Sequence, residues 1–501
     1  MTRTHRATLT FISNMLRQGA QLCVGLLATP IIIRGLGANL YGAYQMLEQC
    51  AQLLTRSDLR PMGTLRVMLA VKQHEHDYDE KQRLIGAAFK ISLFMCLFII
   101  IAGIGIVYYI PNLIKVDSHY SLSVQIAMTI IVFRIVLHKL METPGAVLSG
   151  MNLDYKAMGL QAFVILFIGV AGVISVQMGW GIVGLATVGS VGVLISGVVN
   201  YIIAKKTLYW FKMSRASRSE LVMFTKKTFW FLMTGIADGL LTTCDLLIIG
   251  KVLSPSDVAI FATTGAVLRF SSPPITTLLS STSSGMADLC GRKAWERIKE
   301  IRMEANIIIS AMLGIVGTGI ILLNKMFLLL WIGEGYYAGG LINFLMVIAI
   351  FFRVLCKVDS NIIEAQVLFK EQSIITITCG AFVCIVGISL TSMYGSAGML
   401  IASISGFIAL LYFQRRLIRK KTPLSYSFRY TRDLRLYFVI GLLFITSYYL
   451  SEYITANTYM AFTLILAVNV VLSSLIIFYL GLDNIHKTLV TKRVKTLIAK
   501  K

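Results

Sequence analysis

Segments of about 20 mostly apolar residues recur along almost the whole chain, and no other feature constrains the fold as strongly. A helix of that length and composition crosses the hydrocarbon core of a bilayer. Only 14% of the residues are charged, whereas a soluble domain carries about 25%. No domain-sized polar stretch separates the apolar segments. The sequence therefore predicts an all-α integral membrane protein without soluble appendages.

Fourteen transmembrane helices are predicted from these segments and the breaks between them. They cover residues 8–36, 41–71, 83–110, 121–150, 155–178, 181–204, 226–251, 256–290, 303–332, 337–366, 371–394, 397–414, 434–453 and 458–481. The first segment has a basic start, but Arg17 and Gln18 interrupt its apolar stretch and no small-residue cleavage site follows. We therefore expect it to be a retained helix and not a signal peptide.

Lys and Arg residues are distributed unevenly between the two sides of the predicted membrane domain. With the N-terminus inside, the inner segments hold 33 of them, and the outer connections hold only Lys115, Lys251 and Lys325. Because cytoplasmic loops collect basic residues, both termini are predicted to be cytoplasmic. Contact of these loops with anionic lipid heads accounts for the net charge of +23, so we expect no nucleic-acid partner.

An internal repeat relates the two halves of the chain. Residues 34–44 align with 251–261 at an offset of 217, and 153–156 align with 367–370 at an offset of 214. Both alignments pair helices running in the same direction, which predicts a parallel repeat about an axis along the membrane normal. The predicted organisation is a six-helix bundle (1–206), a cytoplasmic linker (207–225), a second six-helix bundle (226–420), and two additional helices with a basic cytoplasmic tail (421–501).

Nine basic residues lie deep within the predicted spans. They are Arg17, Arg56, Arg60, Arg66, Arg134, Lys139, Arg269, Arg353 and Lys357. At about 2.5–3.5 kcal/mol each, burying all nine in lipid would cost about 20–30 kcal/mol. They must therefore face water, acidic partners or an anionic ligand.

Helical spacing suggests how some of these cations converge. Arg56 and Arg60 are four residues apart, which predicts that they share one face of the second helix, with Asp58 on the opposite face. Pro61 is expected to kink that helix just after Arg60. Arg134 and His138 have the same spacing in the fourth helix, as do Arg353 and Lys357 in the tenth.

The acidic residues within the spans allow two interpretations. They include Glu48, Asp58, Glu142, Asp238, Asp245, Asp359 and Glu364. In the first interpretation these carboxylates neutralise the cations in structural pairs between helices. In the second, nine cations against about seven acids leave a positive excess for an anion such as a pyrophosphate, which a planar guanidinium binds through pairs of oxygens.

Other motifs carry no catalytic or metal chemistry. The His74-Glu-His76-Asp77 run lies in a charged loop and is expected to be solvated. The eight cysteines nearly all fall in apolar segments without a C-x-x-C pair, which favours a packing role. No phosphate-binding loop is present. We predict no catalytic residue, cofactor or metal. Pro273 and Pro274 predict a kink or break in the eighth span.

Residues 31–44, IIIRGLGANLYGAY, and residues 245–261 resemble the polysaccharide flippases of the multidrug/oligosaccharidyl-lipid/polysaccharide exporter superfamily. The resemblance covers most of residues 8–420. It implies two six-helix bundles, related by pseudo-twofold symmetry, that rock around a central cavity. The implied cargo is an undecaprenyl-pyrophosphate-linked oligosaccharide for O-antigen and lipopolysaccharide, capsule or exopolysaccharide biosynthesis. Fourteen helices resemble the lipid II flippase branch, in which the last two helices help to form a lipid groove.

The same resemblance suggests a location, partners and a site. It implies a bacterial inner (cytoplasmic) membrane protein that is no enzyme and works with a polysaccharide polymerase and chain-length machinery. Cationic cavity residues are a feature of these flippases, and the candidates for pyrophosphate binding are Arg17, Arg56, Arg60, Arg134, Arg269 and Arg353. The candidates for ion coupling are Asp58, Asp238 and Asp245.

Two alternatives stay open at this point. The first is a multidrug and toxin extrusion exporter of cationic drugs, which shares the superfamily fold but wants acidic residues at its site. The first predicted helix carries no carboxylate. The second is a membrane glycosyltransferase or polymerase that uses the same lipid, although such enzymes commonly have a sizeable outer domain and the outer connections here are short.

Overall fold

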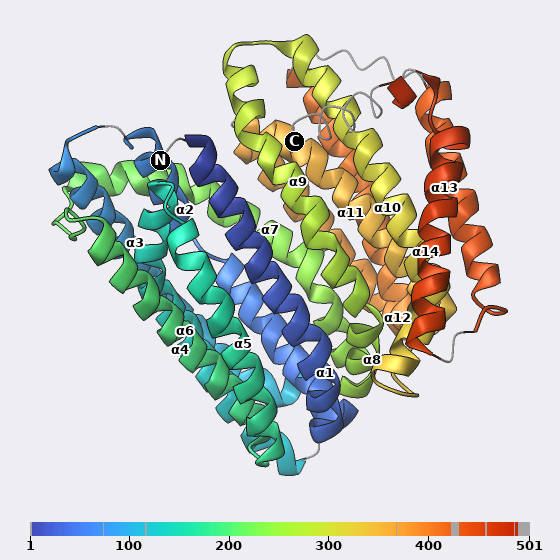
Figure 1. Cartoon of the computed structure of the whole chain (residues 1–501). Coiled ribbons are helices and arrows are strands. Elements are labelled where there is room, and N and C mark those ends of the chain that lie inside the picture. Colours follow the sequence, from blue (N-terminus) through green and yellow to red (C-terminus); the bar gives the residue numbers. More distant parts are fainter. Residues whose placement is uncertain are drawn as a thin grey trace. The chain divides into compact units, whose positions relative to one another are not determined.

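The computed structural model confirms an all-helical membrane protein (Figure 1). It describes residues 3–73, 75–115, 118–366, 368–421, 430–455, 458–484 and 486–488. His74 and the tail beyond residue 488 lie outside these ranges. The chain divides into two compact units, Met1–Ala259 and Ile260–Lys501.

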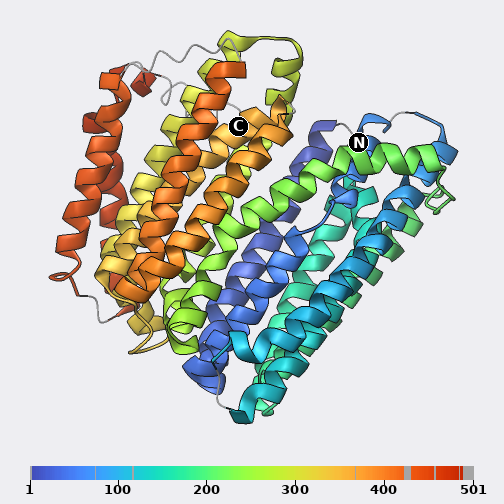
Figure 2. The same cartoon turned by 180° about the vertical axis from the view of Figure 1, so that it is seen from behind.

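The first unit holds most of the predicted N-terminal spans. Its helices are α1 (Arg3–Arg56), α2 (Pro61–Val71), α3 (Tyr78–Leu113), the short η1 (Ser118–Tyr120), α4 (Ser121–Gly150), α5 (Tyr155–Gln177), α6 (Gly181–Thr207) and α7 (Arg218–Val252). Helix α1 packs against α5 and α7, and α4 packs against α3 and α6 (Figure 2). The apolar helices of the first unit thus pack against one another.

The second unit contains the remaining spans. They are α8 (Pro255–Thr264), which crosses the boundary between the units, α9 (Ala266–Gly291), α10 (Trp295–Trp331), α11 (Gly340–Ala365), α12 (Phe369–Lys421), α13 (Tyr430–Leu450), α14 (Tyr459–Ile476) and a π-helical turn, η2 (Ile477–Gly481). Helix α10 packs against α9, α11, α13 and α14. The two additional C-terminal helices therefore belong to the second unit.

Two of the helices each account for two predicted spans. Helix α1 is interrupted at Gly37 and α12 at Tyr394 and Gly395. Gly37 and Gly395 have positive φ values of 74° and 62°, which side-chain-bearing residues rarely adopt. Within the described residues, ten helices, among them α1 and α12, are long and apolar enough to cross a membrane. Helices α9 and α13 supply the other predicted segments.

The breaks between helices recur at the predicted offsets. The break at Gly37 corresponds to Ser254, between α7 and α8, at an offset of 217. At an offset of 214, the start of α5 at Tyr155 corresponds to the start of α12 at Phe369. Gly181, with φ 56°, corresponds in the same way to Gly395. The internal repeat is therefore visible in the backbone.

The segment predicted as a linker is packed and not extended. Gln82 of α3 donates from Nε2 to the Trp210 carbonyl over 3.0 Å. The backbone carbonyl of Gln82 accepts a hydrogen bond from the Ser214 N–H at 3.2 Å. Helix α7, which we expected to open the second bundle, packs against α1, α2 and α3. The boundary defined by packing consequently lies within α8.

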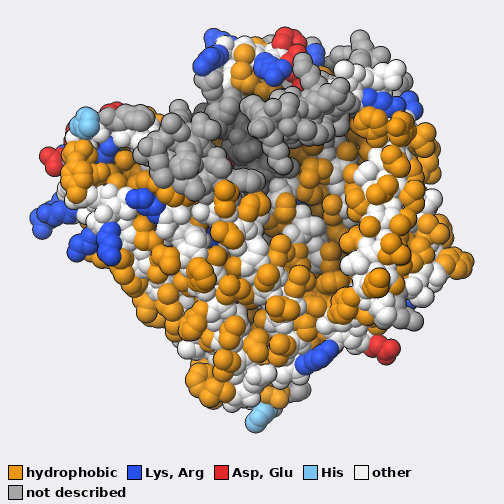
Figure 3. All heavy atoms as spheres, in the orientation of Figure 1, with side chains coloured by type: hydrophobic (Ala, Val, Ile, Leu, Met, Phe, Trp, Pro, Cys, Tyr) orange, Lys and Arg blue, Asp and Glu red, His pale blue; other side chains and the backbone are white. Residues whose placement is uncertain are grey.

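A broad apolar surface covers one side of the first unit. Phe94 and Phe98 of α3 and Phe163 and Phe167 of α5 are each more than half exposed. Figure 3 shows hydrophobic side chains over much of the face drawn there, with Lys and Arg mainly at its margins. This surface is suited to contact lipid, because exposing so many large apolar side chains to water would be unfavourable. Several of the deep charged residues of the first unit lie on other helices, among them Arg56 on α1, Arg134 on α4 and Asp238 on α7.

Candidate functional site

The second predicted span is broken in the middle of its charged stretch. Helix α1 ends at Arg56, and α2 begins at Pro61, with Arg60 as its N-cap residue. Arg60 has φ 48° and ψ 47°, a left-handed conformation. The ring of Pro61 disfavours the α-helical conformation for the residue before it, which is consistent with the end of the helix before Arg60. The prediction that Arg56 and Arg60 share one face of a continuous helix is therefore wrong.

The two arginines nevertheless approach the same stretch of α7. Arg56 donates from Nη1 to Asp238 Oδ2 and to Thr242 Oγ1, each over 2.7 Å. A Cβ atom on Gly235 would lie 2.2 Å from the Arg56 carbonyl oxygen and 3.8 Å from Arg60 Nη2. Glycine at position 235 thus lets α7 approach the end of α1. The fold brings both guanidinium groups to the segment from Gly235 to Thr242.

A second charged pair joins α1 to α4. Arg134 donates from Nη2 to both carboxylate oxygens of Glu48, over 2.9 and 2.7 Å. A Cβ atom on Gly189 of α6 would lie 2.6 Å from Arg134 Nη1, so this glycine leaves the space that the guanidinium fills. Arg134, a candidate for pyrophosphate binding, is thus held by a carboxylate. The pairing of Arg134 with Glu48 is of the kind that the structural interpretation of the acids predicts.

The third pair in the first unit is the most buried. Lys139 Nζ lies 2.6 Å from Asp58 Oδ2, and the two side chains are 7% and 1% exposed. Glu142 Oε2 lies 3.5 Å from the same ammonium group. Asp58, a candidate for ion coupling, lies in the break between α1 and α2 and neutralises Lys139 of α4. It pairs with neither of the arginines beside it in the sequence.

The other candidates do not gather at one place. Arg17 is half-buried on α1, and its Nε has no hydrogen-bond acceptor among the described residues. Asp245 accepts a hydrogen bond from the Leu246 N–H through Oδ1. In the second unit Arg269 is exposed and donates to the Ala262 carbonyl, and Arg353 is exposed on α11. The strongest convergence of candidates is therefore that of Arg56, Arg60 and Asp238.

The second unit contains a buried charge cluster that the sequence did not reveal. Asp359 of α11 lies 2.6 Å from Arg302 of α10 and 3.3 Å from Arg415 of α12, measured between oxygen and nitrogen atoms. Asp359 and Arg302 are almost completely buried. We had assigned both arginines to cytoplasmic loops. Helices α10 and α12 extend beyond their predicted ends, to Trp295 and Lys421, and carry the two arginines inside.

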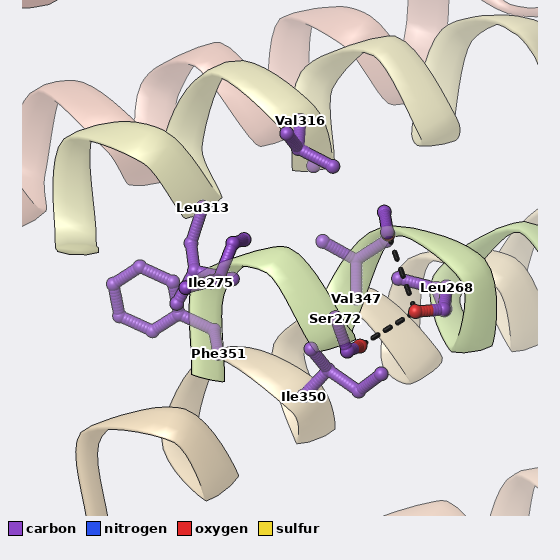
Figure 4. Close-up of a pocket in the computed structure, with 10 residues that line it drawn as sticks. Leu268, Ser272, Ile275, Leu313, Val316, Val347, Ile350 and Phe351 are labelled. Atoms are coloured by element: carbon purple, nitrogen blue, oxygen red, sulfur yellow. Dashed lines mark hydrogen bonds between the residues drawn. The ribbon is translucent and has the colours of Figure 1, made fainter. Parts of the chain in front are cut away.

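A small pocket of the second unit is lined mainly by apolar side chains (Figure 4). It lies between α9, α10 and α11, with Leu313 and Phe351 among its lining residues. The Ser272 hydroxyl donates to the Leu268 carbonyl over 2.6 Å and so leaves no strong donor for a ligand. Helix α9 continues through Pro273 and Pro274 without a break. We find no anion-binding chemistry in this pocket.

Comparisons with known proteins agree with this architecture. A family model described as "Polysaccharide biosynthesis protein" matches residues 66–288. The fold is similar to that of lipid II flippase MurJ in an inward closed conformation, with a TM-score of 0.67 and 16% identity over 94% of this chain and 97% of MurJ. It is also similar to an inward-facing MATE family multidrug resistance transporter of the MOP superfamily, with a TM-score of 0.63 and 14% identity. This match covers 79% of this chain and 94% of the MATE chain.

The fold is thus shared with solved transporters of the MOP superfamily, and part of the sequence matches a polysaccharide biosynthesis family model. A further MATE structure, in complex with MaD3S, has a TM-score of 0.57 and 14% identity over 83% of this chain and 96% of the MATE chain. None of the curated proteins matches the sequence. The matched share of this chain is larger for MurJ, at 94%, than for the two MATE structures, at 79% and 83%.

Proposed function

We propose that this MOP-type transporter flips an undecaprenyl-pyrophosphate-linked oligosaccharide from the inner to the outer leaflet of a bacterial cytoplasmic membrane. The product would serve O-antigen, capsule or exopolysaccharide synthesis. The observation that carries the proposal is the approach of two guanidinium groups, Arg56 at Asp238 and Arg60 at Gly235, to one stretch of α7. The fold shared with a lipid II flippase supports a lipid-linked cargo.

The chemistry of this pair suits a diphosphate. Both hydrogen bonds that Arg56 makes use Nη1, so Nε and Nη2 donate to no other part of the described protein. Arg60 is exposed, and its guanidinium forms no ion pair with any described residue. Arginine stays charged and holds phosphate oxygens in pairs. The two side chains together therefore offer enough donors for two adjacent phosphoryl groups.

The translocation step follows from the charge of the cargo. The diphosphate binds the arginines while the prenyl chain stays in the lipid, and the two halves of the transporter alternate in their access to the two sides. An inside-negative potential favours outward movement of an anion by about 2.3 kcal/mol per charge per 100 mV. Proton or sodium coupling would use Asp238 more readily than Asp58, because Asp58 is buried against Lys139.

An exporter of cationic drugs, as in the MATE transporters, is the competing function, and the distribution of carboxylates argues against it. Such a site needs an available acid. Glu48, Asp58, Glu142 and Asp238 of the first unit each lie within 3.5 Å of a basic side chain. The polar helices therefore offer guanidinium donors to a ligand more readily than carboxylates.

The proposal is tested with purified protein in liposomes. A fluorescent undecaprenyl-pyrophosphate oligosaccharide reports translocation through its access to an impermeant quencher or glycosidase. Hydrogen bonds to charged groups contribute about 1.5–3 kcal/mol, so Arg56→Ala and Arg60→Ala should each slow translocation by about 10-fold or more. Lys115→Ala removes an exposed charge elsewhere and should leave the rate unchanged.

The possible results separate the two functions. Wild-type rates in both arginine variants would exclude this site. No translocation by the wild-type protein under imposed proton and sodium gradients, together with export of cationic dyes, would replace the flippase by a drug exporter. Co-purification with a polysaccharide polymerase or a chain-length regulator would test the partners implied by the proposed pathway.

A further inference from the structure

Three ion pairs among the charged residues of the candidate site, Arg56–Asp238, Arg134–Glu48 and Lys139–Asp58, differ in how much of the carboxylate is exposed. Asp58 is 1% exposed, Glu48 is 25% exposed, and Asp238 is 51% exposed. The first two acids are enclosed between helices, and Glu48 accepts both of its bonds from one guanidinium. Only Asp238 could leave its cation and become solvated without a large rearrangement of the helices.

The cation beside Asp238 is also the one with unused donors. Arg56 contacts Asp238 and Thr242 through a single nitrogen, Nη1. Neither Nε nor Nη2 is among the buried polar atoms that lack a partner, so these two donors are accessible. Arg60 Nη2 lies near the same turn of α7, 3.8 Å from the Cβ position of Gly235. Asp238 is thus paired with Arg56, while the Arg60 guanidinium lies near Gly235 on the preceding turn of α7.

We infer that Asp238 is an internal competitor of the transported anion. In the empty site its carboxylate occupies Arg56, and the incoming diphosphate displaces it and binds Arg56 together with Arg60. When the diphosphate leaves, Asp238 returns to Arg56 and hinders rebinding of the anion. Asp238 thus sets the affinity of the site and promotes release. This inference rests on the proposed function, because it assumes that the anion binds at Arg56.

Thr242 has a separate part in this arrangement. Its hydroxyl accepts a hydrogen bond from Arg56 Nη1 and donates one to the Asp238 carbonyl, over 2.7 and 2.6 Å. It therefore holds the guanidinium against α7 whether or not the Asp238 carboxylate is bound. Loss of this hydroxyl should misplace Arg56 without changing the charge of the site. Thr242 is a positioning residue, and its removal should have the opposite effect to removal of the Asp238 charge.

The test measures binding of inorganic pyrophosphate to the purified detergent-solubilised protein by titration calorimetry, at constant salt. Asp238→Asn keeps the shape of the side chain and removes its charge, and it should bind pyrophosphate about five-fold more tightly, in the range expected for a partly exposed ion pair. Thr242→Val should bind it more weakly than wild type. Asp79→Asn removes an exposed charge at the first turn of α3 and should change nothing.

A second measurement tests release. In the liposome assay, Asp238→Asn should show a lower KM and a lower maximal rate than wild type, because the anion leaves more slowly. A purely structural role of Asp238 would reduce the rate without lowering KM. Thermal unfolding of each variant shows whether the fold is kept, and Asp238→Glu, which keeps the charge, should restore a KM close to that of wild type.

The results distinguish the two levels of the proposal. If Arg56→Ala binds pyrophosphate as tightly as wild type, the site itself is wrong, and the role of Asp238 falls with it. If Arg56→Ala loses binding but Asp238→Asn binds no more tightly than wild type, the site stands and only the competitor is refuted. Tighter binding in Asp238→Asn with wild-type binding in Asp79→Asn supports the competitor.

Discussion

Replacing Asp58 by Asn should destabilise the protein through the lysine that it leaves behind. Asp58 and Lys139 are 1% and 7% exposed and lie 2.6 Å apart. Breaking a buried ion pair by removing one partner costs about 3–5 kcal/mol, because the other charge stays buried. Glu142, 3.5 Å from the ammonium group, offsets part of this loss, so we expect about 3 kcal/mol. For a unit of this size, that corresponds to a fall in Tm of about 6–12 °C.

Thermal unfolding of the purified protein in detergent measures the effect, with Asp79→Asn as the control for loss of an exposed acid. The double variant Asp58→Leu with Lys139→Met removes both charges and should recover most of the lost stability, because no charge is left buried without its partner. If Asp58→Asn lowers Tm by less than about 2 °C, the reasoning is refuted. A double variant less stable than the single one would refute it as well.

Two further predictions concern α7. Gly235→Ala places a Cβ atom 2.2 Å from the Arg56 carbonyl oxygen, a backbone atom that cannot move aside. The variant should therefore unfold at a lower temperature and translocate more slowly than wild type. Gly105→Ala, whose Cβ atom would have nothing within 4 Å, serves as the control. At the N-terminus of α7, hydrogen bonds from the Ser217 N–H and hydroxyl and from Arg83 lower the pKa of Glu220 below its usual 4.5. This group therefore contributes stability above pH 4.5 that is lost as the pH falls through its lowered pKa, and Glu220→Gln should flatten the acid side of a plot of stability against pH.

The spans were predictable from the sequence because their signal is local. A run of apolar residues long enough to cross a membrane carries its own length and approximate ends, and glycines such as Gly37 and Gly395 mark the turns. The repeat was equally accessible, since breaks at matched positions need matched turn residues. The prediction was weaker at the cytoplasmic ends, where α10 and α12 continue into charged segments through helical turns that hydropathy does not detect.

The pairing of charges was not predictable, because it depends on which helices become neighbours. Asp58 lies two residues from both Arg56 and Arg60, yet its partner is Lys139, 81 residues away. Arg302 and Arg415 looked like loop residues until the fold placed them on either side of Asp359. Sequence reasoning identified many of the deep cations but missed the buried Arg302. The identity of each partner is a property of the tertiary structure.

The cluster around Asp359 also has a mechanical consequence. One carboxylate binds arginines from two other helices, so α10, α11 and α12 are tied together at a single point. Separating α10 from α11 would break the buried Arg302–Asp359 pair and leave a charge uncompensated in a medium of low polarity, at a cost of several kcal/mol. These three helices should consequently move as one rigid body. Bending during the transport cycle should therefore occur in other parts of the chain.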